Sequence, residues 1–148
     1  MSSAKYPCDL HVHSHFSPDA EAEPDELFQR AKERGLTTLV ITDHNTTRHL
    51  NVARAAAQKY GLETLEGVEI STRGNTQSVH ILGYATRFDR DILEAGLAST
   101  IAALNARAQT MIELLRTQSI VDLDFATIAG RQHGAYVGRH EIARAIAA

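Results

Sequence analysis

The sequence predicts an α/β fold, and three observations indicate it. The chain has 148 residues, of which 43 % are apolar, and this is enough to bury the core of one domain. As far as residue 84, short runs with strand character alternate with longer runs of helical periodicity. Beyond that point the periodicity is helical. We therefore expect a β/α portion over residues 1–88 and a helical portion over residues 89–148.

Four strands are expected in the first portion, at residues 8–13, 37–42, 62–70 and 77–84. The first alternates with period two, so Cys8, Leu10 and Val12 share an apolar face that would bury the Cys8 thiol. The second is apolar almost throughout, as buried parallel strands are. The third and fourth are separated by a loop at residues 73–75, which is short enough for an antiparallel hairpin.

Five helices are expected, at residues 24–34, 48–60, 90–118, 125–129 and from residue 138 onward. The first opens with Pro24 and two acidic residues and ends before Gly35, and Gly61 is well placed to end the second. In the third, apolar residues return every three or four positions. The last is still helical at Ala148, so we expect either a chain cut short there or a partner over its end.

The composition excludes several classes of protein. Fifteen basic and eighteen acidic side chains give a formal charge of −3, which argues against strong nucleic-acid binding. The longest strongly apolar run, residues 39–41, is far too short to span a membrane, and the N-terminus has no apolar signal core. A single cysteine excludes an internal disulfide and suits a reducing compartment, so a cytoplasmic protein is expected.

Histidines and acidic residues recur along the predicted strands. His11 and His13 share one strand face, about 7 Å apart, and His44 directly follows the second strand. Glu69 and His80 lie between apolar neighbours on the third and fourth strands, where they are costly to bury unless a metal ion or a partner satisfies them. A lone histidine on a strand is more often a core residue, but four successive strands carry such groups. Because the carboxyl ends of neighbouring parallel strands meet at one edge, the pattern predicts a metal centre there.

Five motifs, in this order, resemble the polymerase and histidinol phosphatase (PHP) family. They are Asp9-Leu10-His11-Val12-His13, Ser17-Pro18-Asp19, Thr42-Asp43-His44-Asn45, Gly67-Val68-Glu69-Ile70-Ser71 and Val79-His80-Ile81-Leu82-Gly83. The resemblance covers residues 8–84 and, more loosely, the helical stretch behind them. It implies a distorted β/α barrel, of which this chain would hold the N-terminal part and a helical insert. It also implies a phosphoric ester hydrolase with up to three divalent ions of manganese, iron or zinc.

The resemblance further implies six metal ligands. They are His11 and His13 for one ion, Glu69 as a bridge to a second ion that His80 also binds, and Asp19 and His44 for the third. Asp9 and Asp43 also match family positions, and we expect them to orient ligand imidazoles.

Two departures from the family pattern bear on these roles. The pattern continues beyond this chain with a His-Pro strand end and an Asp-x-His pair, so each ion would lack one ligand here. The family's Arg-x-His-x-Ala-Arg run, which would meet the phosphate, corresponds to residues 139–144, where the histidine stands one place early and Glu141 takes its usual position. Arg139 and His140 are therefore candidate phosphate ligands, although both also suit a solvated helix start.

We expect a metal-dependent phosphoesterase that hydrolyses phosphomonoesters of small nucleotides or similar metabolites. Two alternatives stay open: a histidinol-phosphatase-like enzyme, and a non-catalytic metal-binding module that is truncated or serves a polymerase. An amidohydrolase is disfavoured, because none of the three lysines lies on a predicted strand where it could bridge two metals. No catalytic residue is identified beyond the metal ligands.

The number of predicted strands also bears on completeness. A barrel needs about eight strands to close around a filled interior. Four strands leave an open edge, and open edges invite pairing with another chain. We therefore expect either a protein whose C-terminal half is missing here or a homodimer that covers the edge.

Overall fold

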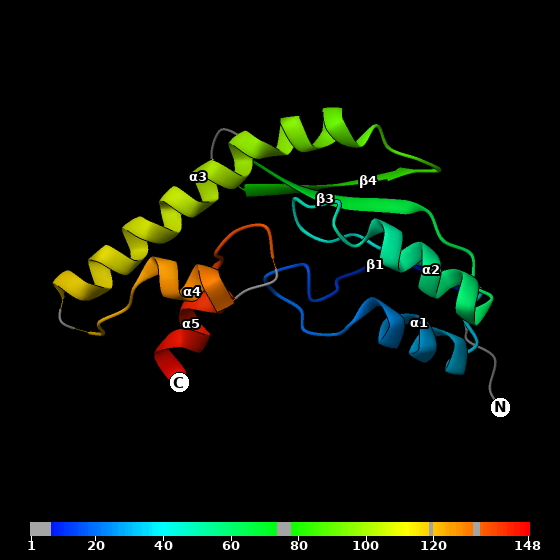
Figure 1. Ribbon diagram of the computed structural model, residues 1–148, viewed down its shortest axis with the longest axis horizontal. Coiled ribbons are helices and arrows are strands. Elements are labelled where there is room, and N and C mark those ends of the chain that lie inside the picture. The colour runs from blue at the N-terminus through cyan, green and yellow to red at the C-terminus, as the bar shows by residue number, and fades with distance from the viewer. Residues whose placement is uncertain (1–6, 74–77, 119, 132–133) are drawn as a thin grey trace.

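The strands of the computed structural model pair as two two-stranded sheets (Figure 1). β1 (Cys8–Val12) runs parallel to β2 (Thr38–Ile41), and β3 (Glu66–Arg73) runs antiparallel to β4 (Ser78–Ala85). The structure describes residues 7–73, 78–118, 120–131 and 134–148. The predicted α/β class and the antiparallel hairpin are confirmed, and most of the loop predicted at residues 73–75 lies outside the described residues.

The described part of the chain holds five helices: α1 (Pro24–Glu33), α2 (Leu50–Tyr60), α3 (Arg90–Thr117), α4 (Phe125–Arg131) and α5 (Arg139–Ala147). Their bounds lie close to the predicted ones because local signals set them. Pro24 opens α1, and Gly61 ends α2 in the left-handed conformation with a φ of 65°. Among the described helices, none combines the length and the apolar character that a membrane crossing requires.

Two apolar clusters hold these helices. The first lies among α1, α2 and β2 and consists of Phe28, Ala31, Leu39, Ile41, Ala53, Ala56, Ala57 and Leu62. The second lies where α4 and α5 pack beneath α3 and consists of Ala108, Ile112, Ile128, Val137 and Ile142 (Figure 1). The second cluster is tied to the first portion of the chain near Pro18, which an added Cβ on Gly138 would approach to 3.2 Å.

β2 and β3 bring the two sheets together. One parallel bridge joins Thr38 of β2 to Glu63, just before β3, and another joins His44, just after β2, to Glu69 of β3. Between these bridges the strands approach so closely that a Cβ on Gly67 would lie 2.6 Å from both the carbonyl oxygen of Ile41 and Cγ1 of Val40. Only glycine allows this approach, which carries Glu69 to the end of β2.

The expected burial of the Cys8 thiol is wrong. Cys8 is exposed and the Leu10 residue is 43 % exposed, whereas Val12 packs against the first apolar cluster. β1 pairs with β2 on one side, and within the described residues no strand lies along its other side. The alternation of polarity correctly predicts a strand, but burial of its apolar face also requires a second neighbouring strand.

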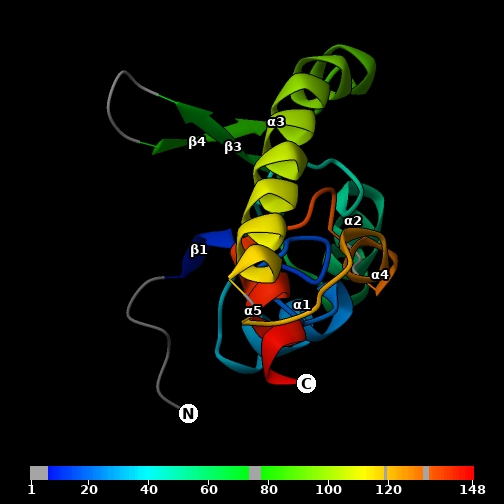
Figure 2. The ribbon, with the colours of Figure 1, turned by 90° about the vertical axis from the view of Figure 1, so that its left-hand side faces the viewer.

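β4 exposes apolar side chains in the same way. Val79 and Ile81, which alternate with His80 along the strand, are 47 % and 53 % exposed. The hydroxyl of Tyr84 donates to the carbonyl oxygen of Leu10 at 2.7 Å and so connects β4 to β1. Figure 2 shows the β3–β4 hairpin extending sideways past the long helix α3.

Replacing Gly67 by alanine is expected to lower the free energy of unfolding by about 1–3 kcal/mol, because the new methyl group would overlap β2. The matched control is Gly96→Ala in α3, where nothing lies within 4 Å of the added Cβ and alanine should stabilise the helix by about 0.5–1 kcal/mol. Urea unfolding of both variants measures the difference. Equal stabilities would contradict the close approach of β2 and β3.

Candidate metal centre

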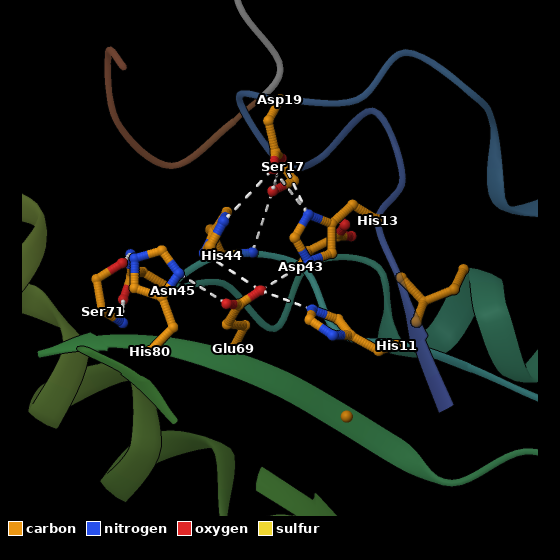
Figure 3. Close-up of polar contacts among 12 residues, drawn as sticks. His11, His13, Ser17, Asp19, Asp43, His44, Asn45, Glu69, Ser71 and His80 are labelled. Atoms are coloured by element: carbon orange, nitrogen blue, oxygen red, sulfur yellow. Dashed lines mark hydrogen bonds and ion pairs between the residues drawn. The ribbon is translucent and has the colours of Figure 1, made fainter. Parts of the chain in front are cut away.

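The carboxylate of Glu69 lies at the centre of a group of imidazoles (Figure 3). Its Oε2 atom is 3.0 Å from Nε2 of His11 and 2.8 Å from Nε2 of His13. Its Oε1 atom is 2.7 Å from Nδ1 of His80, and Nδ1 of His44 lies 3.7 Å from Oε2. Glu69 is only 4 % exposed, so four imidazoles surround one buried carboxylate.

Three separate segments deliver these imidazoles. His11 belongs to β1 and His13 follows it, while His44 follows β2 and bridges to Glu69 on β3. His80 comes from β4, which runs antiparallel to β3 and pairs His80 with Ser71. His80 therefore reaches the centre from near the start of its strand. The sequence pattern instead suggested that it comes from a carboxyl end.

A second carboxylate, that of Asp19, extends the cluster. Nδ1 of His13 lies 2.9 Å from Oδ2 of Asp19, and Nε2 of His44 lies 3.5 Å from the same atom. The hydroxyl of Ser17 donates to Oδ1 of Asp19 at 2.7 Å and accepts the backbone N–H of His44 at 3.2 Å. Ser17 thus fixes the Asp19 loop against the end of β2.

The imidazoles keep both carboxylates ionised. Burial raises the pKa of Glu69, but hydrogen bonds from His11 and His80 and the charge of His44 outweigh it, so the pKa lies below its ordinary value. Burial also raises the pKa of Asp19, and hydrogen bonds from its neighbours hold it well below its usual range. Burial lowers the pKa of His13, but its hydrogen bond to Asp19 and the surrounding carboxylate charges raise it overall.

The donor set fits divalent metal ions. Three groups have ligand atoms that all lie within 4.8 Å of one another: His11, His13 and Glu69; His13, Asp19 and His44; and His44, Glu69 and His80. Two buried ring nitrogens, Nε2 of His13 and Nδ1 of His44, have no hydrogen bond, although Nε2 of His13 is in ion-pair contact with Glu69. An imidazole nitrogen close to a carboxylate oxygen but not aligned for a hydrogen bond is suited to share a cation with it.

The six ligands expected from the sequence thus converge, whereas the expected orienting residues have other partners. One carboxylate oxygen of Asp9 accepts the backbone N–H of His11 at 3.3 Å. The carboxylate of Asp43 accepts the backbone N–H of Ser14 at 2.6 Å and lies 3.0 Å from Nδ1 of His49. Among the described residues, neither of these two carboxylates contacts the imidazole of an expected ligand.

A cavity of about 230 Å³ opens beside the cluster. Asp19, His44 and His80 line it together with Arg139 and His140. The structure therefore places the two candidate phosphate ligands at the same cavity as three residues of the cluster.

Two further residues of this cavity carry no signal in the sequence. Arg107 lines it from α3, and Tyr136 lines it from the loop before α5. Burial raises the pKa of Tyr136 to about 12, and the negative charge of Asp19 adds to this effect. The Tyr136 hydroxyl therefore stays protonated and can donate a hydrogen bond. Neither residue belongs to a motif, and only the packing of the helical portion brings them to the cavity.

The fold and the cluster define the class of protein: an α/β domain with imidazoles and carboxylates gathered where its strands meet. The family model described as the PHP domain matches residues 9–138. The chain belongs to the PHP domain family.

Relatives of known name match parts of the chain. A 3′,5′-nucleoside bisphosphate phosphatase of Chromobacterium violaceum is 39 % identical over 103 residues, which are 70 % of this chain and 36 % of that protein. The 5′-3′ exoribonuclease Rnm of Escherichia coli is 34 % identical over 123 residues, which are 81 % of this chain and 42 % of that protein.

Solved structures show the same likeness. A candidate metal-dependent phosphoesterase from Bifidobacterium adolescentis superposes with a TM-score of 0.82 at 28 % identity, covering 98 % of this chain and 51 % of that one. The chain thus spans about half, or less, of the length of these relatives.

Asn45 holds the loop after β2 against β3, and its replacement should be costly. It has a φ of 53°, its amide nitrogen donates to Oγ of Ser71 at 2.9 Å, and its amide oxygen accepts the Ser71 N–H at 2.9 Å. Asn45→Ala loses both bonds and keeps a Cβ in the left-handed region, whereas Asn45→Gly loses the bonds alone. We expect both variants to be less stable than the native chain, and alanine less stable than glycine by about 1–2 kcal/mol in urea unfolding. An alanine variant as stable as the glycine variant would contradict this account.

Proposed function

We propose that this chain carries the metal centre of a divalent-metal-dependent phosphoesterase that hydrolyses phosphomonoesters of small nucleotides or similar metabolites. The observation that carries the proposal is the buried Glu69 carboxylate, shared between two of the three ligand groups. A mixed set of imidazoles and carboxylates suits manganese, iron or zinc. Membership of the PHP family and the names of the relatives support the same class of chemistry.

The residues of the centre have distinct tasks in this proposal. Glu69 would bridge two ions, of which His11 and His13 hold one and His80 the other. Asp19 would hold a third ion together with His44. Bound divalent ions supply charge neutralisation, activation of water and stabilisation of the leaving oxygen. The protein orients the imidazoles through their carboxylate contacts and keeps both carboxylates ionised at neutral pH.

The cavity beside the cluster suits a phosphate group. Arg139 and Arg107 line it, and within the described residues neither guanidinium has an ion-pair partner. Guanidinium groups bind phosphate oxygens through paired, charge-assisted hydrogen bonds. In a chain with a net charge of −3, two such groups facing one cavity favour an anionic substrate there. Tyr136 can add a neutral hydrogen-bond donor.

The volume and the lining of the cavity bear on the size of the substrate. The cavity volume of about 230 Å³ lies below the range of roughly 300–1,000 Å³ that is common for ligand pockets. Tyr136 is the one phenylalanine, tyrosine or tryptophan among the described residues that line it. Grooves for single strands instead stack several bases on aromatic side chains. These features favour a small phosphoester over a polymer, although one relative is named as an exoribonuclease.

Removing the shared carboxylate should empty the centre. Glu69→Gln keeps the size of the side chain but loses the charge that bridges two ions, so most of the bound manganese should be lost. Elemental analysis of the purified chain after manganese loading and gel filtration measures this. Glu113→Gln, which changes an exposed carboxylate on α3, is the control and should bind as the native chain does. Full occupancy in the Glu69 variant would rule out the bridging role.

The substrate class is tested by kinetics with added manganese. We expect Arg139→Gln to raise KM for a nucleoside monophosphate or bisphosphate about tenfold or more, since a charged hydrogen bond contributes roughly 1.5–3 kcal/mol. Arg116→Gln, on the far part of α3, should leave KM unchanged. Phosphate release from mononucleotides is compared with shortening of a single-stranded oligonucleotide. Preferred turnover of the oligonucleotide would overturn the small-substrate proposal, and metal uptake without any hydrolysis would favour a non-catalytic module.

A further inference from the structure

A second polar cluster lies beneath the metal centre and is completely buried. Its members are Ser14, Asp43 and His49, and each residue is 0 % exposed. None of them belongs to the three ligand groups. Figure 3 shows Asp43 next to His13. A buried carboxylate and imidazole without a role would be a considerable cost to folding, so the cluster calls for an explanation.

The neighbours of the His49 ring determine which ring nitrogen carries a hydrogen. Its Nε2 atom lies 3.2 Å from the carbonyl oxygen of Ile41 and 3.1 Å from that of Gly67, and carbonyl oxygens only accept, so Nε2 carries a hydrogen. Its Nδ1 atom lies 3.0 Å from Oδ2 of Asp43, outside hydrogen-bond alignment but at ion-pair distance. The ring therefore donates from Nε2 to the two strands and lies with Nδ1 against the Asp43 carboxylate.

The position of His49 between two strands gives the ring a structural task. β2 and β3 are bridged at Thr38 with Glu63 and again at His44 with Glu69. Between these two bridges, the His49 N–H reaches carbonyl oxygens of both strands, from Ile41 and from Gly67. The ring thus joins the strands at the place where Gly67 lets them approach most closely. The next bridge along the strands joins two residues of the metal centre.

The Asp43 carboxylate extends the same support to a second strand end. It accepts the backbone N–H of Ser14 at 2.6 Å and the Ser14 hydroxyl at 2.5 Å. Ser14 follows His13, and Asp43 precedes His44. One carboxylate therefore holds the backbone next to two of the imidazoles that face Asp19 and Glu69.

We propose that His49 is a positioning residue of the metal centre: its ring joins β2 to β3 and lies against Asp43, and thereby sets His13 and His44 around Glu69. The role rests on the metal centre proposed above. His49 itself lies at the N-terminal end of α2 and contacts no ligand residue among its described contacts. Its effect on the centre passes through Asp43 and the two strands.

The hydrogen that joins His49 to the two strands can be observed without any metal. Long-range proton–nitrogen correlation spectra of the chain labelled with ¹⁵N-histidine, recorded at pH 7.5, should show a hydrogen on Nε2 of His49. His49→Gln assigns the signal. A His49 ring without a hydrogen on Nε2 would overturn the proposal. This measurement uses the native chain, so it remains decisive if the variants fail to fold.

The effect on the centre is measured by manganese titration calorimetry. His49→Gln should weaken manganese binding about 10- to 100-fold, the range typical of residues that orient metal ligands. Phe28→Leu is the matched control, because Phe28 is equally buried but lies in the core between α1 and α2. At a similar loss of thermal stability, this variant should keep manganese affinity within about twofold, as expected for distant sites. Equal losses in both variants, or native affinity in His49→Gln, would overturn the role.

The coupling of the pair is tested by a double-mutant cycle. If His49 acts through Asp43, the variant His49→Gln/Asp43→Asn should bind manganese no more weakly than His49→Gln alone, because the loss of His49 already releases Asp43 from its position. Additive losses would show that the two residues act separately and would contradict the proposal. A native chain that binds no manganese would overturn the proposed function and this role with it, whereas native binding with an unaffected His49 variant would overturn this role alone.

Discussion

The carboxylate of Glu69 is the constraint on which the rest of the first portion of the chain depends. A carboxylate that is 4 % exposed is stable only if opposite charge or hydrogen-bond donors surround it. The donors are imidazoles from three segments that are distant in the sequence. Satisfying one acid therefore specifies where β1, the end of β2 and β4 lie relative to β3. The same atoms provide the ligand groups, so the requirement of folding and the requirement of metal binding coincide.

The approach of β3 to β2 follows from this constraint. To bring Glu69 to the end of β2, the residues of β3 that precede it must lie against Val40 and Ile41, and Gly67 makes room for this contact. The carbonyl oxygens of Ile41 and Gly67 then both face the His49 ring. A donor on α2 thus satisfies acceptors of two strands, in agreement with the general rule that buried backbone groups find a partner. The centre is supported from below by packing and hydrogen bonds, and not by the loops alone.

Local sequence signals account for most of the fold that the sequence could predict. Helix ends at Pro24 and Gly61 are set by neighbouring residues, and the parity of His11 and His13 is a property of one strand. Burial of Cys8 could not be predicted, because it depends on how many strands flank β1. The direction from which His80 enters follows from the antiparallel pairing of β4, which the short loop indicated but which the expectation of carboxyl ends meeting at one edge did not include.

The residues that support the site could not be predicted from the sequence for a related reason. His49 stands at the start of a helix, where a histidine is ordinarily solvated, and nothing local shows that Asp43 and two strands enclose it. Arg107 lies on a helix whose apolar periodicity explains its other residues, and it meets the cavity only because α3 crosses the hairpin. Motifs identify ligands that a metal selects directly, whereas residues that act through packing have no fixed spacing.

The exposed apolar residues of β1 and β4 have a consequence for the behaviour of the chain in solution. Leu10, Val79 and Ile81 are about half exposed, and they lie on strands whose outer edges pair with no other strand among the described residues. Charge repulsion between copies is weak at a formal charge of −3, and it weakens further as salt screens it. Sulfate and phosphate strengthen apolar association at the same time. The colloidal stability of the chain is therefore governed by buffer salt, with low ionic strength and weakly salting-out anions keeping these edges apart.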